Sequence, residues 1–258
     1  MEIHIVDHCN LNCAYCTHYS PLTKEKFVDT VQYENDFKRL SKLGADKVRR
    51  VRLLGGEPLL HDKLPTLTRI ARECFLKSEI QVVTNGILLP KQSDEFWDVC
   101  SKHNIEIYIS SYPINLDYEL IKSLAKKHKI KLIYHDNDNS VDRLQMAKYV
   151  LDIDGQQNLR EAFRICTAAN GTCTNLRDGK LYQCPTSAYI SVFNEYFSRN
   201  LELSEKDYID IYKVNSMDEI FEFLRRPVPF CRFCVNNYAA FPWKTSKKEI
   251  SEWVAVKE

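Results

Sequence analysis

The sequence predicts an α/β fold over its first 155 residues, and two observations support this prediction. Short apolar runs alternate with segments whose apolar residues recur at three- and four-residue spacing, which is the pattern of strands followed by amphipathic helices. Five strands are expected with four helices between them, and a weaker sixth strand follows. Such repetition favours parallel strands with helices on their outer face. We therefore expect a partial (β/α)6 barrel, similar to a TIM barrel, followed by a small module.

The expected strands are short apolar runs bounded by polar or glycine-rich segments. They lie at residues 2–6, 47–54, 80–84, 105–110, 130–135 and, more weakly, 148–153. The expected helices lie between them, at about 31–43, 63–77, 91–103 and 117–128. Barrels of this kind carry their chemistry on the loops that follow the strands. We therefore expect the core domain, 1–155, to hold its functional residues in those loops.

The alternation stops after residue 155, and we expect a separate module over 156–240. The stretch "CTNLRDGKLYQCP" predicts a β-hairpin that turns at Asp178-Gly179, a strong turn pair. A helix is expected in "SMDEIFEFLRRP", before "PFCRFC". This module is poor in apolar residues, so a bound metal group is expected to stabilise it. The tail, 241–258, carries Trp243 and Trp253 and is expected to pack back on the core.

The composition excludes several classes of protein. Lys and Arg number 36 against 35 for Asp and Glu, and a net charge of +1 argues against nucleic acid or a membrane surface as partner. No apolar run is long enough to span a membrane. The chain starts directly on a strand, with no signal pattern, so we expect a cytoplasmic protein. In a reducing compartment, clustered cysteines indicate metal binding or catalysis.

The chain has 10 cysteines, and most of them cluster. The clusters are Cys9, Cys13 and Cys16; Cys166, Cys173 and Cys184; and Cys231 and Cys234. Cys74 and Cys100 stand alone in expected helices, and we interpret both as buried small hydrophobic residues.

The first cluster follows the first expected strand with the spacing C-x3-C-x-aromatic-C, in which Tyr15 is the aromatic residue. This loop resembles the signature of the radical SAM superfamily. The resemblance implies that Cys9, Cys13 and Cys16 bind three irons of a [4Fe–4S] cluster and leave the fourth iron for S-adenosylmethionine. A structural zinc site with a distant fourth ligand is the alternative.

Further motifs follow the next three strands: "GGEP", "TNG" and "SSY". The first consists of Gly55, Gly56, Glu57 and Pro58. Its glycines let the backbone approach a ligand closely, and a carboxylate suits an ammonium group. The resemblance implies that Glu57 meets the amino group of S-adenosylmethionine, that Asn85 lies near its ribose, and that Ser110 or Ser111 lies near its carboxylate. A simple turn between strand and helix is the alternative for "GGEP".

The later cysteines form a second pattern. Cys166 is followed by twelve residues, Gly179, four residues and Cys184, and Cys231-x2-Cys234 comes later. This resembles the twitch module, a shortened SPASM domain, and implies an auxiliary [4Fe–4S] cluster held by four cysteines. A zinc ribbon is the alternative. The size, barrel and single-cluster module together are similar to those of short aminocyclitol dehydrogenases that oxidise 2-deoxy-scyllo-inosamine.

Cys173 is a fifth cysteine in this module, and three interpretations of it stay open. It replaces Cys166 as a ligand, it is an inert strand residue, or its thiol donates a hydrogen atom to a substrate radical. His8, His18 and Ser20 flank the first cysteine loop, and we favour loop residues that bond backbone over pocket residues. We interpret "KKHKIK" (126–131) as a solvated face and "DNDNSVD" (136–142) as a plain polar loop.

The resemblance also implies the chemistry. An external one-electron reductant of flavodoxin or ferredoxin type drives cleavage of S-adenosylmethionine to methionine and a 5′-deoxyadenosyl radical, which abstracts hydrogen from the substrate. The chain begins at its first strand without a leader-binding domain, so we expect a small substrate such as a sugar or aminocyclitol, oxidised or epimerised. Modification of a ribosomally made peptide, by thioether or carbon–carbon crosslinking or by epimerisation, is the alternative. An iron–sulfur electron carrier or zinc scaffold leaves "GGEP" without a role.

Overall fold

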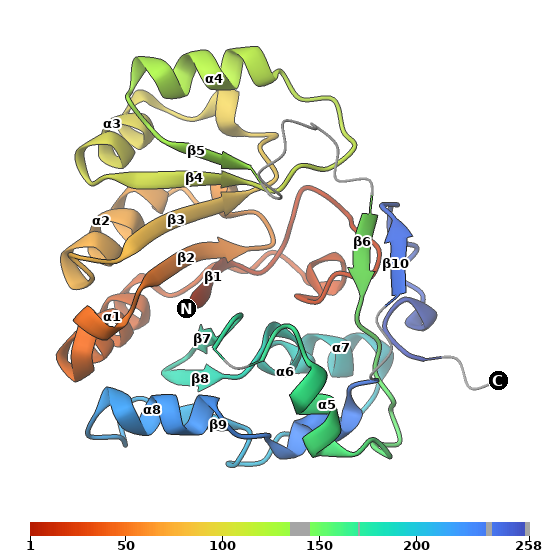
Figure 1. Cartoon of the computed structure of the whole chain (residues 1–258). Helices are drawn as coiled ribbons and strands as arrows, with labels where there is room; N and C mark the ends of the chain where they lie inside the picture. The colour runs from red at the N-terminus through yellow and green to blue at the C-terminus, as the bar shows by residue number, and fades with distance from the viewer. Residues whose placement is uncertain (135–144, 170, 236–238, 256–258) are drawn as a thin grey trace. The chain divides into compact units, whose positions relative to one another are not determined.

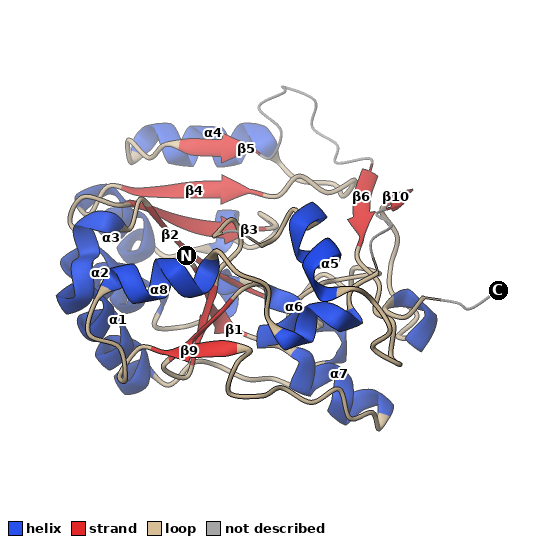
Figure 2. Ribbon diagram, turned by 60° about the horizontal axis from the view of Figure 1, so that its bottom comes forward, coloured by secondary structure: helices blue, strands red, loops and turns tan. Residues whose placement is uncertain are grey.

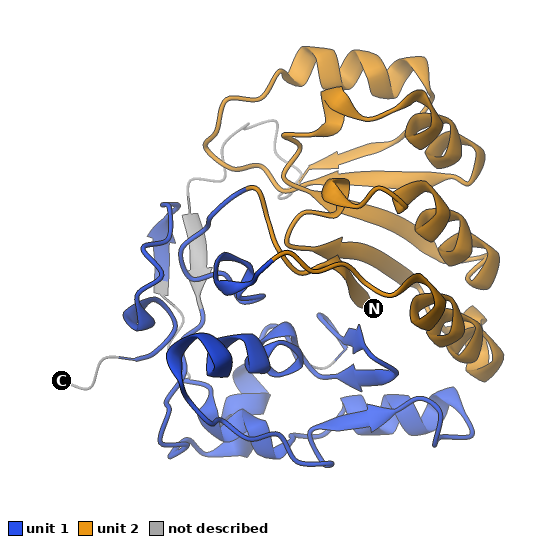
Figure 3. Cartoon of the chain, turned by 180° about the vertical axis from the view of Figure 1, so that it is seen from behind, with its two compact units in different colours: residues 1, 11–24, 145–258 blue, residues 2–10, 25–144 orange. Residues whose placement is uncertain are grey.

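The computed structural model describes residues 1–134, 145–169, 171–235 and 239–255, and Figure 1 labels its elements in chain order. The chain divides into two compact units, coloured separately in Figure 3. The sheet unit comprises residues 2–10 and 25–144. The cysteine unit comprises residue 1, residues 11–24 and residues 145–258. The division falls inside the first cysteine loop, with Cys9 in the sheet unit and Cys13 and Cys16 in the cysteine unit.

The sheet unit is built on a parallel sheet with the order β5-β4-β3-β2-β1. Its strands are β1 (Glu2–Val6), β2 (Arg50–Gly55), β3 (Glu79–Thr84), β4 (Ile105–Ile109) and β5 (Leu132–Tyr134). Its helices are α1 (Thr30–Gly44), α2 (Leu64–Cys74), α3 (Asp94–Lys102) and α4 (Tyr118–Lys127), with the short 3-10 helices η2 (Ala45–Lys47), η3 (Pro58–Leu60) and η4 (Leu89–Lys91). Neighbouring strands are consecutive in sequence, so right-handed connections place all four helices on one face (Figure 2). The predicted α/β fold with a parallel sheet is confirmed.

The two faces of this sheet differ because side chains alternate along each strand. Val51, Leu53, Ile80, Val82 and Ile107 point to the helix side and are all fully buried. They form the apolar core that holds the helices to the strands, as expected for a parallel sheet.

The opposite face carries a polar ladder across the amino-terminal ends of the strands. Arg52 donates to Glu2 at 3.4 Å and to Gln81 at 3.1 Å. Gln81 in turn donates to Glu106 at 2.8 Å, and Lys131 donates to Glu106 at 2.6 Å. Each charged or polar group therefore has a partner on the next strand, which removes the cost of burying it alone. The ladder lies at the end of the strands opposite the candidate site.

The cysteine unit contains the predicted hairpin. Strands β7 (Asn175–Arg177) and β8 (Lys180–Tyr182) pair antiparallel, and β9 (Tyr208–Asp210) extends them. The turn residues Asp178 and Gly179 have φ of 49° and 74°, as a two-residue hairpin turn requires. The remaining elements are helices α5 (Leu159–Ile165), α6 (Pro185–Ala188), α7 (Ile190–Phe197) and α8 (Met217–Leu224), with η1 (Ser20–Leu22), η5 (Pro229–Phe233) and η6 (Ile250–Glu252). The helix predicted in "SMDEIFEFLRRP" is α8 and begins after the capping residue Ser216.

The weak sixth strand predicted at 148–153 is wrong. Strand β6 (Gln145–Lys148) instead pairs antiparallel with β10 (Ala239–Pro242) in a separate two-stranded sheet. Leu151 makes only isolated bridges, to Cys234 and Val254. A short apolar run indicates a strand but does not specify which strand pairs with it. Here the partner is β10, from the carboxyl-terminal part of the chain. The predicted polar loop at 136–142 lies outside the described residues. No helix in the described part of the chain is long and apolar enough to cross a membrane.

Candidate functional site

In the sheet unit, the predicted motifs lie at one edge of the parallel sheet. Cys9 comes three residues after β1, "GGEP" begins on the last residue of β2, Asn85 follows β3 and Ser110 follows β4. The strands are parallel neighbours, so their carboxyl ends lie along the same edge, where ligands bind in open α/β sheets. The topology therefore assembles these four positions.

The two glycines of "GGEP" lie directly against the first cysteine loop. The Gly56 N–H donates to the Val6 carbonyl at 2.8 Å, and the Glu57 N–H donates to the His8 carbonyl at 3.0 Å. A Cβ on Gly55 would lie 1.9 Å from the Val6 oxygen, and one on Gly56 would lie 1.9 Å from the His8 oxygen and 2.8 Å from the Cys9 nitrogen. The close approach that these glycines allow is made here with the chain's own backbone, and it fixes the path of the chain into Cys9.

Glu57 is fully buried and joins the loops after β2 and β3. One carboxylate oxygen accepts from the Thr84 hydroxyl at 2.7 Å and from the Leu59 N–H at 3.0 Å. The other accepts from the Asn85 N–H at 2.9 Å. Burial raises the pKa of Glu57 to about 7, and the hydrogen bonds from Thr84, Asn85 and Leu59 lower it only in part. A carboxylate offers about four acceptor positions, so room for one further donor is left.

Asn85 connects the loop after β3 with the first cysteine loop. Its side-chain amide donates to Asn10 Oδ1 at 2.7 Å and reaches Cys9 Sγ at 3.8 Å, and its Oδ1 accepts from the Ile87 N–H at 3.0 Å. The residue is 4% exposed. Its place near a ribose stays a prediction, whereas its contact with the Cys9 sulfur is a role that sequence reasoning missed. The backbone N–H of Ser110 donates to Thr84, Ser111 is buried, and their place near a carboxylate likewise stays a prediction.

In the cysteine unit, Cys13 and Cys16 are surrounded by hydrogen-bond donors. The indole Nε1 of Trp243 donates to Cys13 Sγ at 3.2 Å. Backbone N–H groups of Ser20 and His18 bond to the Cys16 thiol and oppose the effect of burial, which raises the pKa of that thiol. The indole of Trp253 donates to the Cys16 carbonyl at 2.8 Å. Both sulfurs thus have N–H groups directed at them, which is the environment that iron–sulfur clusters use.

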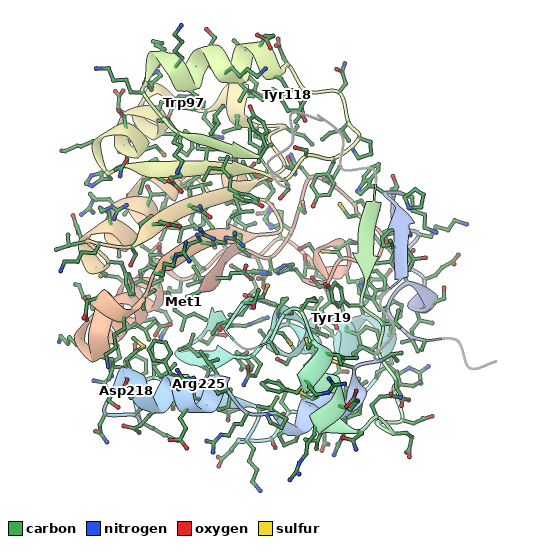
Figure 4. The ribbon with its side chains drawn as sticks, in the orientation of Figure 1. Met1, Tyr19, Trp97, Tyr118, Asp218 and Arg225 are labelled. Atoms are coloured by element: carbon green, nitrogen blue, oxygen red, sulfur yellow. The ribbon has the colours of Figure 1, made fainter. Side chains whose placement is uncertain are left out.

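Tyr19 anchors the same loop in the core of the cysteine unit and is labelled in Figure 4. Its ring is 1% exposed and lies 5.7 Å from that of Phe193 and 6.3 Å from that of Trp253. Burial, followed by the charges of Cys234, Cys184 and Cys16, raises the pKa of Tyr19 well above its usual range. Tyr19 is therefore close to Cys16 and to the second group of cysteines.

That second group lines one cavity of the cysteine unit. The four thiols in its wall belong to Cys166, Cys184, Cys231 and Cys234. Each of these cysteines lies in or at the end of a short helix. Cys166 is the C-cap of α5 and Cys184 is the N-cap of α6. Cys231 lies in η5, and Cys234 follows it directly. The remaining wall is mostly apolar, with Gln183 as a polar member.

The chemistry of this cavity fits a cationic group. Burial first, and then neighbouring cysteines, raise the pKa of Cys231 to about 12 and the pKa of Cys234 well above its usual value. Burial likewise raises the pKa of Cys184, although the Ser187 hydroxyl, 3.5 Å away, lowers it. Four thiolates crowded among apolar walls repel one another, and bound metal removes that repulsion. Among the described residues, no three His, Cys, Asp or Glu side chains are placed to hold a single metal ion. The four cysteines instead line one cavity.

Cys173 lies outside the set of described residues that line this cavity. It occupies a bend before β7, where its N–H donates to the Ala168 carbonyl at 3.0 Å and its carbonyl accepts from Asn175 at 2.7 Å. Strand β7 begins two residues later, at Asn175, so the interpretation of Cys173 as a strand residue does not match the structure.

The remaining predicted residues have ordinary surroundings. Cys100 is fully buried and Cys74 half-buried. His8 accepts from the Lys26 N–H at 3.2 Å, which matches the loop role we favoured. The ring of His18 lies 6.0 Å from that of Tyr189, and Ser20 is buried at the start of η1. Sequence reasoning missed Thr84 and the contact of Trp243 with Cys13. Thr84 is the first letter of "TNG" and so carried a local signal, whereas Trp243 carried none.

Comparison with curated proteins finds partial relatives. A GTP 3′,8-cyclase of Chlorobaculum tepidum is 36% identical over 94 residues, which is 36% of this chain and 28% of that protein. A GTP 3′,8-cyclase of Clostridium botulinum is 28% identical over 141 residues, or 55% of this chain and 43% of that protein. The chain thus spans less than half the length of these relatives.

Two solved structures share the fold. The crystal structure of BtrN in complex with AdoMet and 2-DOIA matches with a TM-score of 0.55 and 16% identity, over 92% of each chain. That of native anSMEcpe with bound AdoMet matches with a TM-score of 0.50 and 16% identity, over 87% of this chain and 82% of that one. At these identities the likeness concerns the fold. Residues 3–110, which contain the three-cysteine loop and the motifs after β2 and β3, match the profile of the Radical SAM superfamily.

Proposed function

We propose that this protein is a radical SAM enzyme that abstracts a hydrogen atom from a small substrate such as a sugar or aminocyclitol and oxidises or epimerises it. The profile match over residues 3–110 carries the proposal, because it includes all three cysteines of the first loop and the whole of "GGEP". The hydrogen bonds directed at Cys9, Cys13 and Cys16 support a [4Fe–4S] cluster on these residues.

A second [4Fe–4S] cluster in a twitch-like module is part of the proposal. Its support is the cavity whose walls hold four thiols, Cys166, Cys184, Cys231 and Cys234, at the ends of short helices. As thiolates these groups would repel one another, which favours a cationic occupant. The cavity favours Cys166 over Cys173 as the first ligand, and Cys173 is left as an inert residue or a hydrogen-atom donor.

The roles of the protein's own residues follow from their contacts. When bound, the clusters would supply one-electron chemistry: reductive cleavage of S-adenosylmethionine and, for an oxidation, acceptance of one electron from the substrate radical. Glu57 has one acceptor position left for the ammonium group of S-adenosylmethionine. Thr84 and Asn85 hold that carboxylate, and Asn85 also holds the loop that carries Cys9.

The choice of a small substrate is supported by the fold shared with BtrN over 92% of each chain, since that protein was crystallised with AdoMet and 2-DOIA. A second candidate is chemistry on a nucleotide. The observation that favours it is the 36% identity to a GTP 3′,8-cyclase, higher than the identity to either structural neighbour.

The test of the class begins with anaerobic reconstitution. Wild type should hold about eight irons and eight sulfides per chain, as two [4Fe–4S] clusters require. Reduction by dithionite should release 5′-deoxyadenosine from S-adenosylmethionine. Cys184→Ser should lose about four irons and keep a cluster that responds to S-adenosylmethionine, whereas Cys173→Ser and the control Cys100→Ala should keep all eight. A wild-type protein with only four irons would refute the second cluster. A wild-type protein that holds zinc and no iron would refute the assignment as a radical SAM enzyme.

The substrate is tested by deuterium transfer. The enzyme is incubated separately with C-deuterated aminocyclitols, sugars, GTP and a model peptide, and 5′-deoxyadenosine is analysed by mass spectrometry. Deuterium from an aminocyclitol or sugar supports the proposal. A product that has lost one deuterium and one further hydrogen identifies oxidation, whereas a product in which one deuterium is replaced by solvent hydrogen identifies epimerisation. Deuterium from GTP or the peptide only would overturn the small-alcohol substrate.

A further inference from the structure

The carboxyl-terminal tail runs antiparallel to the part of the first cysteine loop that belongs to the cysteine unit. Cys13 forms a bridge with Thr245, and the Ala14 N–H donates to the Lys244 carbonyl at 2.9 Å. On the other side, the Ser246 N–H donates to the Asn12 carbonyl at 2.8 Å, and the Asn12 side chain returns a bond to Ser246 at 3.1 Å. These backbone contacts fix the register of tail and loop and so determine which tail side chain lies beside each cysteine.

In this register the indole of Trp243 lies beside Cys13. Its Nε1 is 3.2 Å from Cys13 Sγ, and the two residues are 230 positions apart in sequence. An indole N–H can only donate, so the sulfur is the acceptor. Cys13 is 7% exposed, so little water competes for this hydrogen bond. The contact therefore joins a buried sulfur to a neutral donor held in place by the tail.

Trp253, in the same tail, makes a useful contrast. Its indole is also a donor to the loop, but its acceptor is the Cys16 carbonyl oxygen at 2.8 Å rather than a sulfur. Trp253 is 1% exposed and is part of the aromatic core with Tyr19. Trp253 thus packs in the core and anchors the loop through a backbone carbonyl. Trp243 instead contacts the sulfur of Cys13, one of the proposed cluster ligands.

A donor to a ligand sulfur has a defined electrostatic effect. Reduction adds one negative charge to an iron–sulfur cluster, and part of that charge resides on the sulfurs. A hydrogen bond to a ligand sulfur strengthens as this charge increases, so it stabilises the reduced form more than the oxidised form. Partners of metal ligands commonly tune the metal in this way.

We propose that Trp243 is a positioning residue that raises the reduction potential of the cluster on the first cysteine loop. This inference rests on the proposed function, because it requires a cluster bound through Cys13. The carboxyl-terminal tail then sets how readily that cluster accepts the electron that S-adenosylmethionine cleavage needs. The indole does not touch the substrate in this account and acts only through the Cys13 sulfur.

The test is a redox titration of the reconstituted holoenzyme, followed by EPR with and without S-adenosylmethionine. The cluster on the first loop is identified as the one whose signal changes when S-adenosylmethionine binds. In Trp243→Phe, which keeps a ring but removes the N–H, we expect the equilibrium constant for reducing that cluster to fall about tenfold, equivalent to a midpoint about 59 mV more negative. The potential of the other cluster should not change.

Two further proteins separate tuning from packing. Site-specific 3-benzothienyl-alanine at position 243 keeps the shape of tryptophan and lacks only the N–H, so it should reproduce the shift with iron content unchanged. Trp253→Phe removes the hydrogen bond to the Cys16 carbonyl and should leave the potential unchanged in the protein that retains its iron.

An unchanged potential in the benzothienyl protein would overturn the inference and leave the proposed function standing. Equal shifts in both clusters would overturn it as well, because they indicate a general structural effect. A wild-type protein with no EPR signal that responds to S-adenosylmethionine would overturn the proposed function and the inference together.

Discussion

The buried carboxyl group of Glu57 makes the stability of the sheet unit depend on pH. Burial raises the pKa of Glu57 from 4.5 to about 7 in the folded protein. The folded state therefore holds this proton more tightly than the unfolded state does. The resulting stability is fully present below pH 4.5, is lost progressively as the pH rises, and is gone above pH 7.

The magnitude follows from the two pKa values. Their difference is 2.5 units (7 − 4.5), and at about 1.4 kcal/mol per unit the complete loss is about 3–4 kcal/mol. Between pH 5.5 and pH 8, where an iron–sulfur protein can be handled, about 2 kcal/mol of this loss should be measurable. Glu57 is 0% exposed, so solvent screening does not reduce the figure.

The assay is urea unfolding under anaerobic conditions at several pH values, with wild type and Glu57→Gln compared at each. Glutamine cannot ionise, so the difference in unfolding free energy between the two proteins isolates the titration of Glu57. Wild type should lose stability relative to the variant by about 2 kcal/mol from pH 5.5 to 8. The exposed Glu25, replaced by glutamine, is the matched control for the removal of one carboxyl group. A flat difference for Glu57→Gln would refute the reasoning that its carboxyl group titrates near neutral pH.

Three further predictions concern contacts described above. Gly56→Ala places a Cβ 1.9 Å from the His8 carbonyl oxygen, so it should displace the Cys9 loop and remove about four irons. The Cβ of Gly171→Ala meets nothing within 4 Å, so this variant carries only the backbone strain of a φ of 78° and should keep all the iron. Equal losses in the two variants would contradict the steric argument. In the wild type, the buried Phe230 N–H donates to Asp207 at 2.6 Å, and Asp207→Ala removes this acceptor. The free energy of unfolding in urea should fall by about 1–3 kcal/mol, and η5 should become less stable. Unchanged stability would show that the N–H finds another acceptor. Gln81→Leu removes the centre of the polar ladder, so both Arg52 and Glu106 lose a partner. The free energy of unfolding in urea should fall by about 1–3 kcal/mol. A higher free energy of unfolding would show that the ladder is not stabilising.

The elements of the sheet unit could be read from sequence because their signals are local. Apolar runs mark β1 to β5 within a few residues, and three- and four-residue periodicity marks α1 to α4. The hairpin could be read for the same reason, since Asp178-Gly179 supplies the positive φ angles its turn requires. The sixth strand failed because an apolar run says nothing about its partner, and residues 145–148 pair with 239–242 outside the parallel sheet.

The candidate site was likewise predictable where its residues lie close in sequence. The spacing of Cys9, Cys13 and Cys16 and the motif "GGEP" are local patterns, and the order of strands along the chain indicated that they would meet at one edge. The choice between Cys166 and Cys173 was open. Cys173 lies too close to Gly179 to be the first cysteine of the resembled pattern, but spacing alone does not determine which thiol acts as the ligand. The choice depends on which thiol the end of α5 directs into the cavity with Cys184, Cys231 and Cys234.

By itself the sequence determined the succession of strands and helices, the hairpin turn and the identity of the clustered thiols, because periodicity and turn chemistry act over a few residues. Only the tertiary structure decided which distant groups contact those thiols: Asn85 beside Cys9 and Trp243 beside Cys13. No local pattern encodes these contacts. The first is made by the side-chain amide of Asn85, which also bonds to Asn10, and the second follows from backbone hydrogen bonds between the tail and the cysteine loop. The environment of the sulfurs, and with it the potential we expect for the cluster, is therefore a property of the folded chain.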